Sequence, residues 1–417
     1  MASMNTQANS GIFDPIRIGQ LQLSGRFAKS ATVETRCTVD GYVTDELVQF
    51  YENIARGGTP LIISGAASYN SYSRGVAHQI SVDHDDKIEG LKKVADAVHR
   101  HGSKMFIQIY HTSRQAIPEG VGRSEAQAPS KVWEPTLGVM PRPMTLTEIE
   151  QTIEDFAAAA ERCQKAGFDG IQIHAAHGYL ISAFLTPHTN RRKDRYGGSL
   201  SNRMRLLLET YRAVRRRVGP DFPVTMKING SDELPLRRGM PTSDLVAVTK
   251  MMEDEGLDAV EISTGHYESG TTFSRARWKG FTKRMATVGA GKNMSFLRRN
   301  SMRIFAPFVD TLFNFMGGYE EGFNLKYARE FTKKLNIPVI CVGGFIHKDA
   351  MEKALLDGDC DIISVARGLI ADPHLYKHMK EDRHGPLCVH CNGCLAVAGV
   401  QPAACGNPKV VAPPISA

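Results

Sequence analysis

The sequence lacks the features that would place a protein in or beyond a membrane. No stretch approaches the roughly 18 to 20 uninterrupted apolar residues that a membrane-spanning helix needs. The first residues, MASMNTQANSG, contain neither the cationic nor the apolar segment of a secretory signal. We therefore expect a cytoplasmic protein without a membrane span. Its 417 residues are enough for one large α/β domain with a full core.

Acidic residues are absent from one long segment. Between Thr271 and Val309 there are nine Lys or Arg and no Asp or Glu. Subtracting these nine charges from the net charge of +7 leaves −2 for the rest of the chain. The positive balance thus belongs to one insertion, and we expect a small-molecule substrate and no nucleic-acid partner.

Eight short β-branched runs alternate with amphipathic helical patterns. Strands that are apolar on both faces and alternate with helices indicate a buried parallel sheet, and eight such units favour a closed (β/α)8 TIM barrel over residues 1–375. One predicted helix begins at a Thr145/Glu148 capping box and ends before Gly167. The predicted strands are FAKSATV from Phe27, PLIISGAAS from Pro60, KMFIQIY from Lys104, GIQIHA from Gly170, PVTMKIN from Pro223, AVEIST from Ala259, PVICVGG from Pro338 and DIISVARG from Asp361.

Polar side chains follow the carboxyl ends of these strands, where barrels of this class place their active sites. We expect them to share one mouth of the barrel. They are Thr32, Glu34, Gln108, His111, His174, His177, Lys227, Asn229, Ser263, Thr264, Gly343, Gly344, Arg367 and Gly368.

The seventh and eighth strands end in a pattern typical of phosphate sites. Gly343-Gly344 follows one, and Ala366-Arg367-Gly368 follows the other. Glycines let backbone N–H groups approach phosphate oxygens, and a guanidinium adds bidentate binding. The alternative is that the glycine pair only ends a strand.

His174-x-x-His177, followed by Tyr179, permits three interpretations: a metal site, a packed pair of rings, or a site that holds substrate. The metal interpretation lacks a carboxylate at the same strand end.

The stretch IHAAHGYLISAFLTPHTNRRKDRYGGSLSNRMRLLLE closely resembles the signature block of the old yellow enzyme family of FMN-dependent oxidoreductases. The resemblance extends from about Phe13 to Pro373. It includes SATVE, FIQIYHTSRQA, VGGF and ARGLIADP at the ends of the first, third, seventh and eighth strands.

The resemblance implies FMN across the barrel mouth. Gln108 would bond the pyrimidine edge of the flavin, and Lys227 would lie beside N1 and the C2 carbonyl, where a cation favours hydride acceptance. Val33 stands where many members have a Thr or Cys that tunes the flavin potential. The implied contacts are Ala31, Thr32, Val33 and Ala66 at the ring, and Gly343, Gly344, Ala366, Arg367 and Gly368 at the phosphate.

The resemblance to old yellow enzymes also implies roles for the histidine pair. His174 and His177 would donate to the carbonyl oxygen of a substrate above the flavin and stabilise enolate charge there, by about 3–4 kcal/mol per donor. Tyr179 would protonate the α-carbon as the general acid.

Residues 376–417 form a predicted Cys-rich extension in which Cys388, Cys391, Cys394 and Cys405 have cluster-ligand spacing. The segment resembles the [4Fe–4S] region of 2,4-dienoyl-CoA reductase and trimethylamine dehydrogenase, although its last gap is shorter. A zinc site or a segment that has lost its cofactor are the alternatives.

The insertion after the sixth predicted strand, residues 265–318, is long and basic and ends in the apolar run MRIFAPFVDTLFNFMGG. It permits three interpretations. The first is a lid or a dimer contact. The second is a cationic site, either for an acidic or CoA-linked substrate or for the phosphates of the nicotinamide cofactor. The third is a contact with a membrane surface. Homo-oligomerisation therefore stays open.

Together these observations predict an enzyme that takes hydride from NADH or NADPH and reduces a C=C bond conjugated to a carbonyl. The same fold used oxidatively, as an amine dehydrogenase or demethylase with a cluster, is one alternative. A barrel that binds FMN without turnover is the other.

Overall fold

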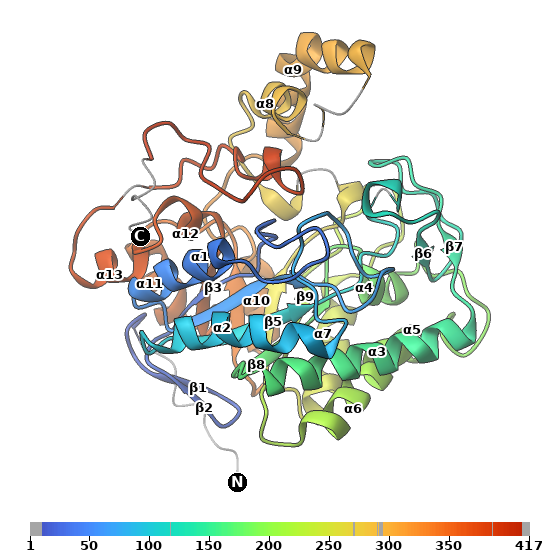
Figure 1. Ribbon diagram of the computed structural model, residues 1–417, viewed down its shortest axis with the longest axis horizontal. Coiled ribbons are helices and arrows are strands. Elements are labelled where there is room, and N and C mark those ends of the chain that lie inside the picture. Colours follow the sequence, from blue (N-terminus) through green and yellow to red (C-terminus); the bar gives the residue numbers. More distant parts are fainter. Residues whose placement is uncertain are drawn as a thin grey trace.

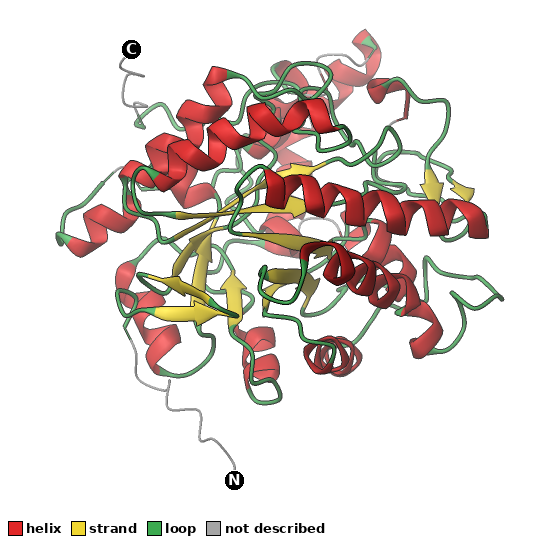
Figure 2. Ribbon diagram, turned by 60° about the horizontal axis from the view of Figure 1, so that its bottom comes forward, coloured by secondary structure: helices red, strands yellow, loops and turns green. Residues whose placement is uncertain are grey.

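The computed structural model describes residues 11–116, 118–269, 272–289, 291, 295–385 and 387–410. Eight parallel strands close into a barrel in the order β10-β11-β12-β3-β4-β5-β8-β9, which confirms the predicted (β/α)8 fold (Figure 2). The barrel strands are β3 (Phe27–Lys29), β4 (Leu61–Ala67), β5 (Lys104–Ile109), β8 (Gly170–Ala175), β9 (Val224–Asn229), β10 (Ala259–Ser263), β11 (Val339–Val342) and β12 (Ile362–Val365).

Helices surround these strands, apart from α8 and α9, which stand away from the barrel (Figure 1). They are α1 (Asp45–Arg56), α2 (Ile88–His99), α3 (Leu146–Lys165), α4 (Leu180–Leu185), α5 (Leu200–Arg203), α6 (Arg205–Val218), α7 (Thr242–Asp254), α8 (Phe281–Thr287), α9 (Phe296–Gly317), α10 (Leu325–Thr332), α11 (Lys348–Leu356), α12 (Arg367–Ala371) and α13 (Leu375–Lys380). None of the helices in the described ranges is both long and apolar enough to cross a bilayer.

The predicted ends of α3 are confirmed. The Thr145 hydroxyl accepts from the Glu148 N–H at 3.2 Å, and the Glu148 carboxylate accepts from the Thr145 N–H at 2.8 Å. Two of the orphan donors at the helix start are thereby paired. Gly167, two residues beyond the last helical residue, has a φ of 85°, a conformation that glycine adopts without strain.

A hairpin closes the amino-terminal end of the barrel. Strands β1 (Ile16–Ile18) and β2 (Leu21–Leu23) pair antiparallel, and their apolar side chains pack against the barrel interior at Ile63 and Phe106. The small sheet of β6 (Gln127–Ala128) and β7 (Arg142–Pro143) lies in the loop that follows β5. With one end filled by this core, the carboxyl ends of the strands are left for a binding site.

The predicted insertion after β10 contains the helical turns η3 (Tyr267–Ser269) and η4 (Thr272–Ser274), followed by α8 and α9. Figure 1 shows α8 and α9 standing away from the barrel, beside the segment that follows α13. The turn η6 (Leu395–Val397) of that segment packs on α8 through a small apolar cluster that includes Trp278, Phe281 and Ala396. The insertion and the Cys-rich segment are therefore in contact, although α8 ends at Thr287 and η6 begins only at Leu395.

Candidate active site

A cavity of about 330 Å³ opens at the carboxyl ends of the barrel strands. Its size is typical of small-molecule sites. Most of the predicted site residues line it: Ala31, Thr32, Val33, Ala66, Gln108, His174, His177, Tyr179, Lys227, Gly344, Ala366, Arg367 and Gly368.

Several residues expected at the mouth do not line the cavity. Gly343 packs instead against the chain before α10, where its carbonyl accepts from the Gly322 and Phe323 N–H groups. His111 is buried, which lowers its pKa to about 3. Glu34, Asn229 and Thr264 also lie outside the cavity lining.

The two histidines form an edge-to-face pair with ring centroids 5.1 Å apart. Burial, together with nearby cationic or imidazole groups, lowers the pKa of both rings well below the usual value, so both are neutral at pH 7. The Nδ1 of His174 accepts from the Ala176 N–H at 3.2 Å, which assigns the proton of that ring to Nε2. The Nε2 of His177 lies 2.6 Å from the Ser263 Oγ.

Tyr179 lies against His174, with ring centroids 4.8 Å apart, and its hydroxyl lies 3.2 Å from that of Tyr267. Burial and the neighbouring tyrosines raise the pKa of Tyr179 well above the usual value. The phenol therefore keeps its proton across the physiological range, as a general acid must before reaction.

Gln115 connects the histidine and tyrosine loops. Its side-chain N–H donates to the His177 carbonyl at 2.6 Å, and its side-chain oxygen accepts from the Tyr267 N–H at 3.2 Å. Gln115 and Tyr267 were missed by the sequence analysis because their loops meet only in the folded barrel.

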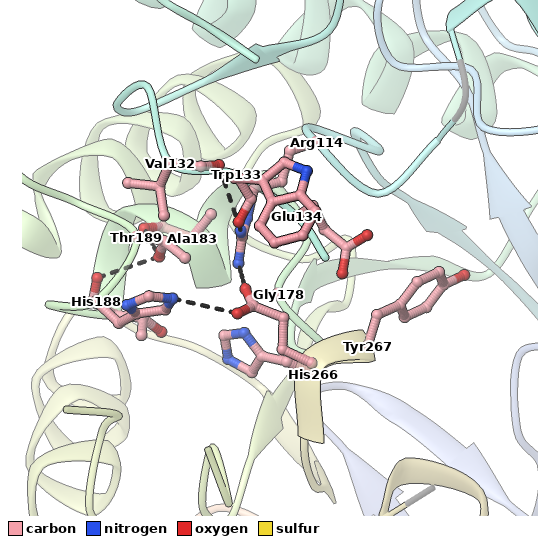
Figure 3. A network of polar contacts seen from close by, with 12 residues as sticks. Arg114, Val132, Trp133, Glu134, Gly178, Ala183, His188, Thr189, His266 and Tyr267 are labelled. Carbon is pink, nitrogen blue, oxygen red and sulfur yellow. Dashed lines mark hydrogen bonds and ion pairs between the residues drawn. The ribbon is translucent and has the colours of Figure 1, made fainter. Parts of the chain in front are cut away.

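A buried network holds the Tyr267 loop (Figure 3). Arg114 forms an ion pair with Glu268, which follows Tyr267, and donates to the Trp133 carbonyl at 2.8 Å. The Glu268 carboxylate also lies 3.3 Å from the His188 ring. Burial lowers the pKa of Arg114 to about 10, which leaves it charged at neutral pH.

Strand register forms the polar floor of the cavity. Glu261 is paired with Lys227, and Gln108 with Gln172, across neighbouring parallel strands. The Lys227 Nζ lies 3.2 Å from the Glu261 carboxylate and donates to the Ser30 hydroxyl at 2.8 Å. Lys227 is therefore an ion-paired cation. The one sequence signal for its partner was the charged residue inside the apolar run AVEIST.

A second buried ion pair lies behind Thr32. The Lys29 Nζ donates to the Thr32 hydroxyl at 3.0 Å and lies 3.5 Å from the Glu34 carboxylate. The Ala403 N–H donates to the Glu34 carbonyl, so the C-terminal segment is fastened to this loop.

The predicted phosphate end of the cavity is also held by the C-terminal segment. Arg367 donates to the Asn392 side chain and, at 2.9 Å, to the Arg275 carbonyl. Gly344 has a φ of 74°, which favours glycine. His390, Cys394 and Leu395 line the cavity beside these residues.

The four predicted metal ligands lie near this wall, and only Cys394 lines the cavity. Burial and the neighbouring cysteines raise the pKa of Cys394 to about 11. Across the described ranges, no three His, Cys, Asp or Glu side chains are arranged to hold a metal ion. The ligand role of Cys388, Cys391, Cys394 and Cys405 stays a prediction.

The sequence pattern of the NADH:flavin oxidoreductase / NADH oxidase family matches residues 11–301. The chain belongs to this family. The resemblance to old yellow enzymes is thus confirmed, as is FMN as the cofactor, and solved old yellow enzyme homologues share the fold.

Three similar proteins show how far the likeness extends. The NADH oxidase of Thermoanaerobacter brockii is 35% identical over 92% of this chain, and the 4,4'-dithiodibutanoate disulfide reductase of Rhodococcus erythropolis is 32% identical over 94% of both chains. A solved 2-naphthoyl-CoA reductase in complex with 2-naphthoyl-CoA is 27% identical, with a TM-score of 0.80 over 96% of this chain and 57% of that one. The chain spans 53% of the length of the Thermoanaerobacter relative.

The cavity wall fits FMN. Thr112, Asn324 and His390 line the cavity, and each has a buried polar atom that finds no hydrogen-bond partner among the described residues. Such atoms are costly unless a ligand or water pairs with them. Arg367 supplies a cation at the end where the phosphate is expected.

Proposed function

We propose that this family member oxidises NADH or NADPH and reduces a C=C bond conjugated to a carbonyl. The observation that carries the proposal is a neutral imidazole pair beside a protonated phenol in one cavity. Hydrogen-bond donors for an oxygen and an acid for a carbon are the groups that this reduction requires.

The histidine pair binds the carbonyl oxygen of the substrate. His174 offers its Nε2–H, because its Nδ1 is already an acceptor. If the Ser263 hydroxyl donates to the Nε2 of His177, that ring carries its proton on Nδ1 and offers it as the second donor. Neutral donors that are fixed before reaction stabilise the negative charge that develops on this oxygen.

Tyr179 delivers the proton to the α-carbon. Its ring packs against that of His174, and Tyr267 replaces the proton through the hydroxyl contact of 3.2 Å. When bound, FMN supplies the hydride-transfer chemistry, which no side chain can perform.

The remaining cavity residues hold FMN in this proposal. Gln108 and Lys227 bind the pyrimidine edge of the ring, and Thr32 and its neighbours pass beside it. Gly343 acts through the loop that it shares with Gly344, since it does not line the cavity. The ring contacts are Ala31, Thr32, Val33 and Ala66, and the phosphate contacts are Gly344, Ala366, Arg367 and Gly368.

Absorption spectra of the anaerobically purified protein test the proposal. A flavin spectrum should bleach on addition of NADH or NADPH and return on addition of cyclohexenone. The name of the Rhodococcus relative makes an aliphatic disulfide the second oxidant to test. Bleaching by an amine and not by a nicotinamide would contradict the proposal, as would a flavin that neither donor reduces.

A further inference from the structure

Helix α9 carries a broad apolar face that none of the described residues covers. Eight of its large apolar side chains are between 42% and 89% exposed. At about 100° per residue, all of these except Phe296 fall within an arc of roughly 120° on one side of the helix. The residues in the arc are Leu297, Ile304, Phe305, Phe308, Leu312, Phe315 and Met316.

The opposite face of α9 fixes the helix to the insertion. Phe313 packs against Trp278, with ring centroids 5.2 Å apart. Asp310 is buried and accepts from the Gly280 N–H at 2.7 Å and from the Thr282 N–H at 3.0 Å. The exposed face is therefore held outward by buried contacts, and Figure 1 shows the helix standing away from the barrel.

All charged side chains of α9 that reach solvent are arginines. Arg298 and Arg303 are exposed and Arg299 is half-buried, while the helix's one acid, Asp310, is buried and bonded to backbone N–H groups. The insertion contains no other acid between Thr271 and Val309. Two copies of this surface would bring like charges together, which opposes self-association and favours an anionic partner.

An apolar face with Arg298 at its border and with Arg299 and Arg303 on the opposite, polar side is typical of an interfacial helix, and α9 is not long and apolar enough to cross a bilayer. We propose that α9 binds the protein to a lipid surface with anionic headgroups. The apolar face enters the boundary between headgroups and acyl chains, and Arg298 at its border meets lipid phosphates. Arg299 and Arg303, on the other side of the helix, add to the attraction toward the anionic surface. The proposal does not depend on the reaction proposed above.

Sedimentation of the full chain with vesicles tests this proposal. We expect binding to phosphatidylcholine vesicles that contain about a quarter phosphatidylglycerol, weak binding without it, and release by salt. Phe308→Ser with Phe315→Ser should lower the partition coefficient on the order of 100-fold. Arg298→Gln with Arg303→Gln should lower it on the order of 30-fold, at about 1 kcal/mol for each arginine.

Two matched variants are the controls. Leu356→Ser removes an exposed leucine of α11, and Arg216→Gln removes an exposed arginine of α6. Both should bind like the parent, and circular dichroism should give all variants the same thermal midpoint.

Three outcomes would overturn the proposal. One is absence of vesicle binding by the parent protein, and another is binding that neither α9 double variant reduces. The third is a dimer that the Phe308/Phe315 variant converts to a monomer, because a second copy would then cover this face.

Discussion

His177 has a left-handed backbone conformation, with a φ of 61°, which is unusual for a residue other than glycine. Its N–H donates to the Asn229 side chain at 3.0 Å, and its carbonyl accepts from Gln115 at 2.6 Å. These contacts stabilise the conformation and turn the ring toward His174. Strained backbone of this kind is common at functional sites.

Replacement of His174 tests the substrate role of the pair. His174→Ala should weaken the binding of phenolic ligands and lower kcat/KM for an enone about 100- to 1000-fold, because one preset donor is lost. FMN content should be unchanged. Absorption titrations with a phenol measure ligand binding, and assays with cyclohexenone measure kcat/KM. His101→Ala, outside the cavity lining, is the control. Loss of FMN would contradict the assigned role.

Replacement of Tyr179 separates the two half-reactions. Tyr179→Phe removes the acid and keeps the ring, so reoxidation by an enone should slow on the order of 100-fold while reduction by NADPH is unchanged. Anaerobic stopped-flow absorption follows each half-reaction. Tyr42→Phe, which changes a tyrosine outside the cavity, is the matched control. An equal loss in both half-reactions would show that Tyr179 is not the proton donor.

At the scale of elements, the capping box stabilises the amino-terminal end of α3. Thr145→Ala should lower the free energy of unfolding by about 1 kcal/mol, because the Glu148 N–H loses its acceptor. Urea unfolding followed by circular dichroism measures this difference. Thr311→Ala, at an exposed position inside α9, should change stability by a few tenths of a kcal/mol at most. Equal effects at both sites would argue against the capping role.

At the scale of the whole molecule, buried neutral histidines make stability depend on pH. The pKa values of His111, His174 and His177 are lowered by burial, so below about pH 6.5 the unfolded chain binds protons that the folded chain does not. The contribution of these histidines to the free energy of unfolding should be complete above pH 6.5. Below pH 6.5 the free energy of unfolding should fall by up to about 1.4 kcal/mol per pH unit for each histidine.

Urea midpoints between pH 5 and 8 measure this dependence. His111→Asn should reduce the slope below pH 6.5 by about one proton. His84→Asn changes an exposed histidine and should leave the slope as it is. A parent protein whose stability stays level from pH 8 to pH 5 would contradict the assignment of neutral buried rings.

The sequence by itself determined the barrel and most of the cavity wall. Strands apolar on both faces must be covered by helices, and parallel strands bring their carboxyl ends to one mouth. Thr32, Gln108, His174 and Lys227 could therefore be assigned to one site from their place after or within predicted strands.

Only the tertiary structure decided which groups touch. Glu261 meets Lys227 through strand register, and Asn392 meets Arg367 because the C-terminal segment returns to the mouth. The sequence left open whether the apolar run in α9 belongs to a lid, a dimer contact or a membrane-surface contact, and only the structure shows that much of it is exposed. The physical reason is that hydrophobicity and periodicity are local properties. Strand register, the position of the C-terminal segment at the barrel mouth and the exposure of α9 depend on how residues distant in sequence are arranged in space.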